Sequence, residues 1–203
     1  MYDDEFELTF DLSDEDEASR APAPEQEPVQ EAAPEPAAEA ETEPPVEAVP
    51  EPAVPAANGR CVLISGGDRG IGAAAARAFW QAGYRVAVLY HTHAEAAAAL
   101  EKELPGLLAV QCDVASRASC EVAFHTVEQA VGHVDVLVSN AGIAQQKLFT
   151  DITPEEWQHM LDVNLSGAFH LCQLALPGMI RRKAGRILTV SSMWGQTGGS
   201  CEV

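Results

Sequence analysis

The strongest constraint on the fold of this chain is a regular alternation of short apolar runs with helical segments over residues 59–203. Each run is hydrophobic almost throughout, which is typical of strands buried on both faces of a parallel sheet. Strands that alternate with helices predict a doubly wound parallel sheet of the α/β class, with right-handed crossovers. The expected strands are 61–65, 85–90, 107–111, 134–139 and 186–191, and the expected helices are 71–82, 94–104, 116–131 and 154–182.

The longest expected helix, 154–182, carries signals for its start and for an interruption. Thr153 stands at the N-cap, Pro154 at the first helical position and Glu156 at the third, which together predict a capping box. The pair Pro177-Gly178 lies inside the same helical pattern. Because proline removes a backbone donor, we expect the helix to bend or end there.

The first 58 residues differ sharply in composition from the rest. They hold 18 of the 31 acidic residues but one of the 12 basic residues, and residues 22–55 hold ten of the 13 prolines. A segment this poor in apolar surface cannot offset the entropy of ordering its backbone. We therefore expect residues 1–58 to form a disordered acidic tail rich in Pro, Ala and Glu, ahead of one nearly neutral domain, residues 59–203.

Composition also bears on partners and location. The acidic tail would repel nucleic acid, and residues 59–203 show no basic stripe. No run of 18 apolar residues occurs, and the first ten residues carry acids where a secretion signal needs Lys or Arg. The five cysteines include no Cys-x-x-Cys pair. The sequence therefore predicts a cytoplasmic protein with no membrane span, no bound nucleic acid, no disulfide framework and no metal site.

A glycine-rich segment joins the first expected strand to the first expected helix. Glycines at this place let the backbone turn tightly and approach a pyrophosphate, and the helix N-terminus offers free N–H groups to the same anion. A glycine-rich stretch between a strand and a helix is a much stronger signal than the glycines alone. The candidate phosphate-binding residues are Ser65, Gly66, Asp68, Arg69, Gly70, Ile71 and Gly72.

The glycine spacing, G-x-x-x-G-x-G, resembles the short-chain dehydrogenase/reductase family, whose motif is Thr-Gly-x-x-x-Gly-x-Gly. Further family marks follow in chain order: Cys112-Asp113-Val114, Ser139-Asn140-Ala141-Gly142, Asp162-Val163-Asn164-Leu165 and Ser191-Ser192. The resemblance covers residues 60–203 and implies a Rossmann-type fold and a nicotinamide cofactor. It also implies that the cofactor contacts Asp113, Val114, Asn140, Ala141 and Gly142.

The end of the second expected strand bears on the choice of cofactor. In dinucleotide-binding folds an acidic residue there bonds the ribose 2′-hydroxyl and repels a 2′-phosphate. Here the position is held by Tyr90, which His91-Thr92-His93 follows. Arg69 in the glycine segment can pair with a 2′-phosphate. We therefore expect NADP(H) rather than NAD(H).

The resemblance assigns two residues to catalysis. Ser192 matches the family's serine, whose hydroxyl polarises the substrate carbonyl as negative charge develops on its oxygen. Asn164 matches the family's active-site asparagine, which holds a proton-relay water. Asparagine is a poor residue inside a helical pattern, which favours a functional reason for its presence.

One family motif is missing from the 203 residues. The family uses a Tyr-x-x-x-Lys pair, in which the tyrosine is the general acid, and places that tyrosine two positions past Val203. General acids contribute about 10²–10⁴-fold to rate. We therefore expect the chain to be a fragment of a longer enzyme, inactive alone, with an open apolar edge on its fifth strand. A homo-oligomer is expected only for the full-length protein.

The substrate is a carbonyl group, and the sequence leaves more than one candidate. Residues 59–203 resemble 3-oxoacyl-carrier-protein reductases; Leu148–Ile152 and Ser191–Val203 more narrowly resemble elongation factor P 5-aminopentanone reductases. The narrower resemblance implies reduction by NADPH of a ketone attached to elongation factor P, with Glu202 as counter-charge for its ammonium group. The alternative substrate is a 3-oxoacyl group on acyl carrier protein. A different class stays open, a non-catalytic nucleotide-binding module whose acidic tail binds a partner.

Overall fold

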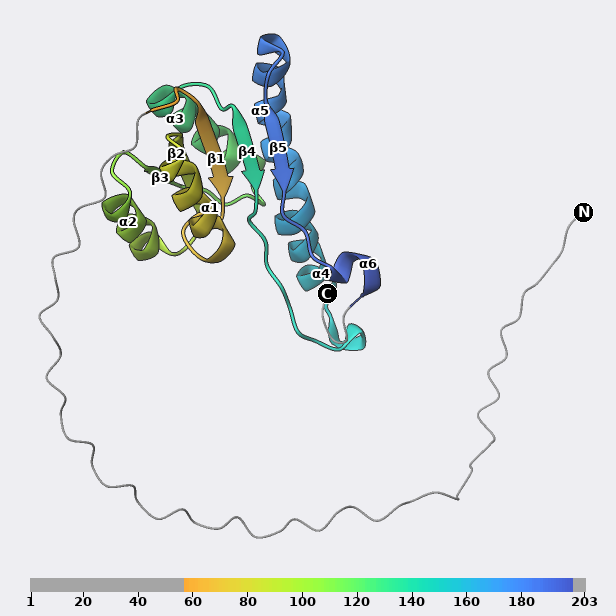
Figure 1. The fold of residues 1–203 in the computed structure, drawn as a ribbon. Helices are drawn as coiled ribbons and strands as arrows, with labels where there is room; N and C mark the ends of the chain where they lie inside the picture. Colours follow the sequence, from red (N-terminus) through yellow and green to blue (C-terminus); the bar gives the residue numbers. More distant parts are fainter. Residues whose placement is uncertain (1–56, 199–203) are drawn as a thin grey trace, which may run out of the picture. The chain divides into compact units, whose positions relative to one another are not determined.

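A computed structural model describes residues 57–198 of the chain. The expected acidic tail up to residue 56, and Glu202 near the C-terminus, lie outside the described residues. Five parallel strands form one sheet in the order β3-β2-β1-β4-β5 (Figure 1), which confirms the doubly wound parallel sheet. The strands are β1 (Cys61–Ser65), β2 (Arg85–Tyr90), β3 (Leu108–Gln111), β4 (Val136–Ser139) and β5 (Arg186–Thr189).

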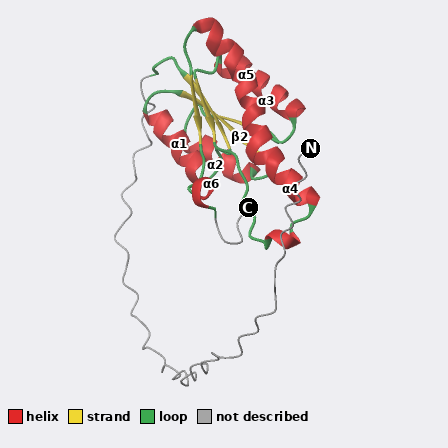
Figure 2. Cartoon of the chain, turned by 90° about the vertical axis from the view of Figure 1, so that its right-hand side faces the viewer, coloured by secondary structure: helices red, strands yellow, loops and turns green. Residues whose placement is uncertain are grey.

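Helices cover both faces of this sheet (Figure 2). Helices α1 (Gly70–Gln81) and α2 (Ala94–Glu103) pack on one face, and α3 (Arg117–Val131) and α5 (Gly167–Arg182) pack on the other. Alternate residues of β1 serve the two cores: Val62 and Ile64 belong to the core under α1 and α2, and Leu63 belongs to the core under α3 and α5. The central strand is therefore buried over its whole length.

The segment expected as one helix, 154–182, consists of three parts. They are α4 (Pro154–Leu161), a π-helical turn η2 (Asp162–Ser166) and α5. The capping box at Thr153 and Glu156 is confirmed. Helix α5 does not end at Pro177, because its buried residues Leu171 and Met179 pack into the same core on both sides of the proline. This packing outweighs the roughly 3 kcal/mol that an interior proline costs.

Strand β5 is less buried than the central strands, as the open apolar edge expected for the fifth strand implies. All four residues of β5 are exposed or half-exposed, and Leu188 is 47% exposed. The position of β5 at one end of the sheet is the physical reason. Two short helical elements, η1 (Phe149–Asp151) and α6 (Trp194–Thr197), are too short to show a periodicity in the sequence.

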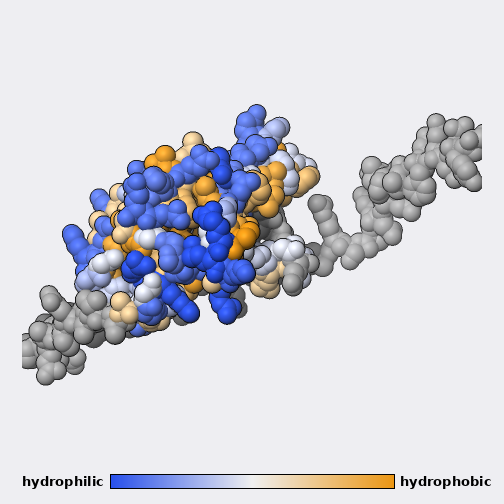
Figure 3. All heavy atoms as spheres, turned by 90° about the horizontal axis from the view of Figure 1, so that it is seen from above, coloured by the Kyte–Doolittle hydropathy of each residue, from blue (hydrophilic) through white to orange (hydrophobic). Residues whose placement is uncertain are grey.

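The described surface mixes polar and apolar groups. Seen from above, the side from which the strands begin, blue hydrophilic residues surround smaller orange hydrophobic areas (Figure 3). Within residues 57–198, no helix is both long and apolar enough to traverse a bilayer. In the same range no three His, Cys, Asp or Glu side chains gather as ligands for a metal ion.

Candidate functional site

The candidate site is a cavity of about 520 Å³ at the carboxyl ends of the strands. Strands β1 and β4 are neighbours there although they are far apart in sequence, so the strand order reverses between them. Such reversal points are where doubly wound sheets bind ligands. The cavity brings together eleven residues expected to bind the cofactor: Gly66, Asp68, Arg69, Gly70, Ile71, Tyr90, Asp113, Val114, Asn140, Ala141 and Gly142.

The other two expected residues, Ser65 and Gly72, lie behind the cavity. Ser65 is fully buried, and its hydroxyl accepts hydrogen bonds from the amides of Asn140 and Ala141. A Cβ atom at Gly72 would collide with the carbonyl oxygen of Gly66 and come within 2.7 Å of the Asn140 side-chain amide. Both residues therefore shape the glycine segment from within, and Gly66 and Asp68 to Ile71 line the cavity.

The start of α1 gives the cavity an anion-binding wall. The first intrahelical bond is donated by Ala73 to the carbonyl of Arg69, so the amides before Ala73 have no partner inside the helix. Gly70 has φ +53° and open space where a side chain would stand, which leaves these amides uncovered. The partial positive charge of the helix end also favours a bound anion. A pyrophosphate fits this wall.

The far wall lies at the ends of β2 and β3. Tyr90 ends β2, and Asp113 follows β3. The Asp113 carboxylate accepts a hydrogen bond from the Ala115 amide at 3.0 Å, and its own amide donates to the Ser119 hydroxyl at 3.0 Å. These bonds fix the turn that carries Asp113 and Val114 against the cavity. Both residues therefore lie at the cavity, where the family resemblance expects contacts with the cofactor.

Several cavity residues were not identified from the sequence. His91 and His93 follow β2 directly, and this position brings them to the cavity. The signal that could have revealed them is this position, because doubly wound sheets bind ligands at the carboxyl ends of their strands. The remaining unanticipated residues are Leu89, Thr92, Cys112, Ile143, His159 and Val163.

Asn164 lies beside the cavity, in the π-helical turn η2. Its side-chain amide donates to the carbonyl of Ile143 at 3.0 Å, and its oxygen accepts from the Ile143 amide at 2.9 Å. This reciprocal pair ties η2 to the segment after β4, where Gly142 and Ile143 line the cavity. Such π-turns are frequent at functional sites.

Ser192 does not line the cavity. It follows β5 and is exposed, and its hydroxyl accepts a hydrogen bond from the Trp194 amide at 3.3 Å. Strand β5 adjoins β4, so Ser192 and the cavity share the same edge of the sheet. The structure thus groups the expected cofactor residues with Asn164 and leaves Ser192 at the neighbouring strand end.

Comparison with known proteins agrees with the geometry of the site. The family model described as short chain dehydrogenase matches residues 60–203, which is more than half of the chain. The protein belongs to the short-chain dehydrogenase/reductase family. Members of this family are oxidoreductases that use a nicotinamide cofactor, NAD or NADP, and the fold and cavity described above have the arrangement that such a cofactor requires.

Two individual relatives show which reductases the chain is similar to. The chain is 40% identical over 137 residues to an acetoacetyl-CoA reductase of Paracoccus denitrificans, a match that covers 68% of this chain and 56% of the relative. It is 40% identical over 144 residues to the 3-oxoacyl-[acyl-carrier-protein] reductase MabA of Mycobacterium avium, a match that covers 70% of this chain and 53% of the relative. The chain spans about half the length of the curated relatives it matches.

Proposed function

We propose that this chain is the cofactor-binding part of an NADPH-dependent carbonyl reductase. The observation that carries the proposal is the wall formed by Arg69, His91 and His93 at a cavity where Tyr90 replaces the usual acid. A 2′-phosphate would meet cationic or neutral groups at this wall and no carboxylate at the end of β2. The start of α1 would hold the pyrophosphate.

The chain's own residues have separable tasks in the proposed reaction. Bound NADPH supplies the hydride. Asp113 and Val114 would bind the adenine ring, and the glycine segment would fix the phosphates. The hydroxyl of Ser192 would donate a hydrogen bond to the carbonyl oxygen as it gains negative charge. Asn164 holds the Ile143 backbone in place and would position a water for proton transfer.

For the substrate we propose a 3-oxoacyl thioester carried by coenzyme A or acyl carrier protein. Support comes from the relatives named acetoacetyl-CoA reductase and 3-oxoacyl-[acyl-carrier-protein] reductase. The second candidate is the 5-aminopentanone group on elongation factor P. It is supported by the segment after Ser192, where Met193 and Trp194 are 67% and 46% exposed and could contact a large substrate.

Cofactor choice is tested by titrating the protein with NADPH and with NADH and following nucleotide fluorescence. We expect NADPH to bind at least about tenfold more tightly, as one additional charge-assisted contact allows. Equal affinities, or tighter binding of NADH, would overturn the NADPH assignment. Binding of neither nucleotide would overturn the whole proposal and favour a module that acts through its acidic N-terminal segment.

Substrate choice is tested on the form of the protein that its native cells produce, whose intact mass is measured first. NADPH oxidation is followed with acetoacetyl-CoA and, separately, with elongation factor P that carries the ketone. We expect faster turnover of the thioester. Turnover of the elongation factor P ketone alone would replace the first candidate by the second. In either case the reaction should be lost in Ser192→Ala and retained in Ser191→Ala.

A further inference from the structure

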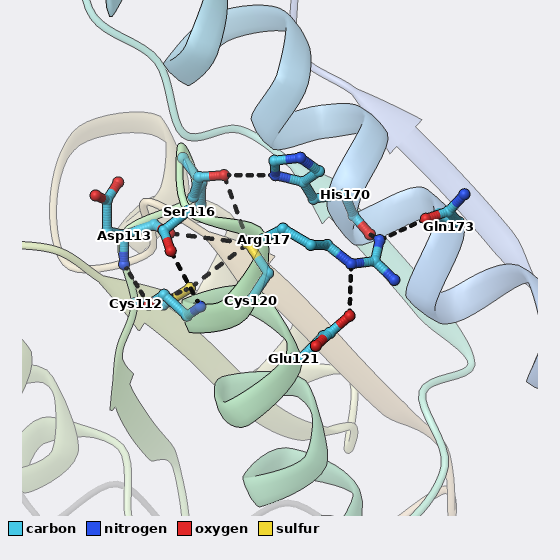
Figure 4. A network of polar contacts seen from close by, with 10 residues as sticks. Cys112, Asp113, Ser116, Arg117, Cys120, Glu121, His170 and Gln173 are labelled. Carbon is cyan, nitrogen blue, oxygen red and sulfur yellow. Dashed lines mark hydrogen bonds and ion pairs between the residues drawn. The ribbon is translucent and has the colours of Figure 1, made fainter.

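Two buried cysteines face each other at the wall of the cofactor cavity. Cys112 follows β3 and Cys120 lies in the first turns of α3, and their sulfur atoms are 3.9 Å apart (Figure 4). Cys112 is 3% exposed and Cys120 is fully buried. Cys112 also belongs to the lining of the cavity, which is the side from which hydrogen peroxide would approach it.

The surroundings give the two thiols different characters. The contact with the Cys120 sulfur, followed by the hydrogen bond from the Ser119 hydroxyl, lowers the pKa of Cys112. The same Cys120–Cys112 contact, reinforced by burial, raises the pKa of Cys120. The thiolate is the reactive form of cysteine. Cys112 is therefore the attacking sulfur, and Cys120 is the protonated neighbour placed to react second.

We propose that Cys112 and Cys120 are a redox modification site, at which hydrogen peroxide closes a reversible disulfide that weakens cofactor binding. The Cys112 thiolate attacks the peroxide O–O bond and becomes a sulfenic acid, and the released hydroxide takes a proton to form water. The Cys120 sulfur then attacks the Cys112 sulfur and expels the second oxygen as water. In sum, two thiols lose two electrons and two protons, and one peroxide becomes two waters.

Closing the bond must displace the cavity wall. A disulfide requires the two sulfurs to approach to about 2.05 Å. The segment between them contains Asp113 and Val114, which line the cavity, and the Asp113 amide is bonded to Ser119, the residue before Cys120. Moving either end therefore shifts the proposed adenine-binding turn. The effect on cofactor binding rests on the proposed function, whereas the formation of the disulfide does not.

The disulfide is tested by treating the protein with hydrogen peroxide, blocking free thiols under denaturing conditions and mapping peptides by mass spectrometry. We expect a linked pair of peptides containing Cys112 and Cys120, and loss of the linkage on reduction with dithiothreitol. Three results would each overturn the proposal. They are recovery of Cys112 and Cys120 as free thiols that carry the blocking group, oxidation of Cys112 beyond sulfenic acid, and a disulfide between Cys112 and another cysteine.

Matched variants separate chemistry from folding. In Cys120→Ser the sulfenic acid of Cys112 should persist and react with dimedone. The control is Cys172→Ser, which removes a half-buried thiol elsewhere and should form the disulfide like the unchanged protein. Absence of a trapped sulfenic acid in a folded Cys120→Ser protein would contradict Cys112 as the attacking residue.

The effect on the cofactor has its own readout. Oxidised protein should bind NADPH about tenfold more weakly than reduced protein, and by linkage NADPH should suppress disulfide formation to the same degree. A linkage that forms but leaves NADPH affinity unchanged would overturn the regulatory part of the proposal alone. If reduced protein fails to bind NADPH while the disulfide still forms, the proposed function fails and the modification site stands.

Discussion

Asn140 donates two hydrogen bonds to Ser65 across the ends of β1 and β4. The Asn140 amide donates to the Ser65 hydroxyl, and the Asn140 side chain donates to the Ser65 carbonyl, each at 3.0 Å. The same side chain also donates to the carbonyl of Gly66 at 3.0 Å. One serine and one asparagine thus join the glycine segment to the strand at which the sheet order reverses.

Replacement of Ser65 by alanine should destabilise the fold. The buried hydroxyl accepts from two backbone amides, Asn140 and Ala141, which would be left without their acceptor. An unsatisfied buried donor costs about 1–3 kcal/mol, and we expect a loss of that size in the free energy of unfolding, measured with urea. The control is Thr126→Ala, because the Thr126 hydroxyl bonds its own helix at the surface and its loss should cost a few tenths of a kcal/mol. Equal losses in the two variants would argue against the role given to Ser65.

Removal of the Arg69 side chain should weaken the binding of NADPH and leave the binding of NADH nearly unchanged. Arg69 lines the cavity at the start of α1, and the proposed 2′-phosphate contact exists in NADPH alone. Arg69→Ala should therefore weaken NADPH binding about tenfold or more and leave NADH binding within a factor of about two. Arg60→Ala, which removes an exposed cation just before the other end of β1, is the matched control and should change neither affinity. A parallel loss for both nucleotides would refute the 2′-phosphate argument.

The sequence was sufficient for the architecture and for most of the cavity. The apolar runs predicted the sheet, and the glycine segment and the end of β2 predicted six cavity residues, because these depend on local pattern; the other five expected cavity residues came from the family resemblance. It was not sufficient at Pro177, where the core around Leu171 and Met179 overrides local propensity. It also could not place Cys112 against Cys120, since their contact depends on how α3 docks beside β3.

A methyl group at Gly72 should disrupt the glycine segment. The added Cβ would overlap the Gly66 carbonyl oxygen, which is backbone and cannot swing aside. Gly72→Ala should therefore lower the free energy of unfolding by about 1–3 kcal/mol, as overpacking does, and weaken cofactor binding as well. Gly106→Ala serves as the comparison, because Gly106 has φ +87° but open space around a built Cβ, so it carries backbone strain without a collision. A Gly72→Ala protein with unchanged stability and nucleotide affinity would rule out this packing argument.

The ion pair of Glu156 with Lys147 should make stability depend on pH. Hydrogen bonds from the Lys147 ammonium and from the Thr153 amide lower the pKa of the Glu156 carboxyl. Because the folded pKa lies below the unfolded one, Glu156 stabilises the fold at neutral pH, and this contribution is lost as the pH falls through the lowered pKa. Glu156→Gln should thus be less stable than the unchanged protein at pH 7, and urea midpoints of the two should converge in acid. A difference that stays constant with pH would show that charge is not its origin.

The pairing of Asn164 with Ile143 predicts a local opening that a single variant should produce. The Asn164 oxygen accepts from the Ile143 amide at 2.9 Å, and this bond joins η2 to the cavity wall. In Asn164→Ala that amide loses its acceptor, so its hydrogen should exchange with solvent about tenfold faster or more, in line with a bond worth roughly 0.5–1.5 kcal/mol. Gln158→Ala removes a surface bond from α4 to Asp162, the first residue of η2, and should leave the Ile143 amide protected. Because the exchange of a single amide is measured, the experiment distinguishes loss of the Asn164–Ile143 hydrogen bond from general destabilisation. Uniformly faster exchange over α4 and α5 would mean that Asn164 supports the helices and not the cavity wall.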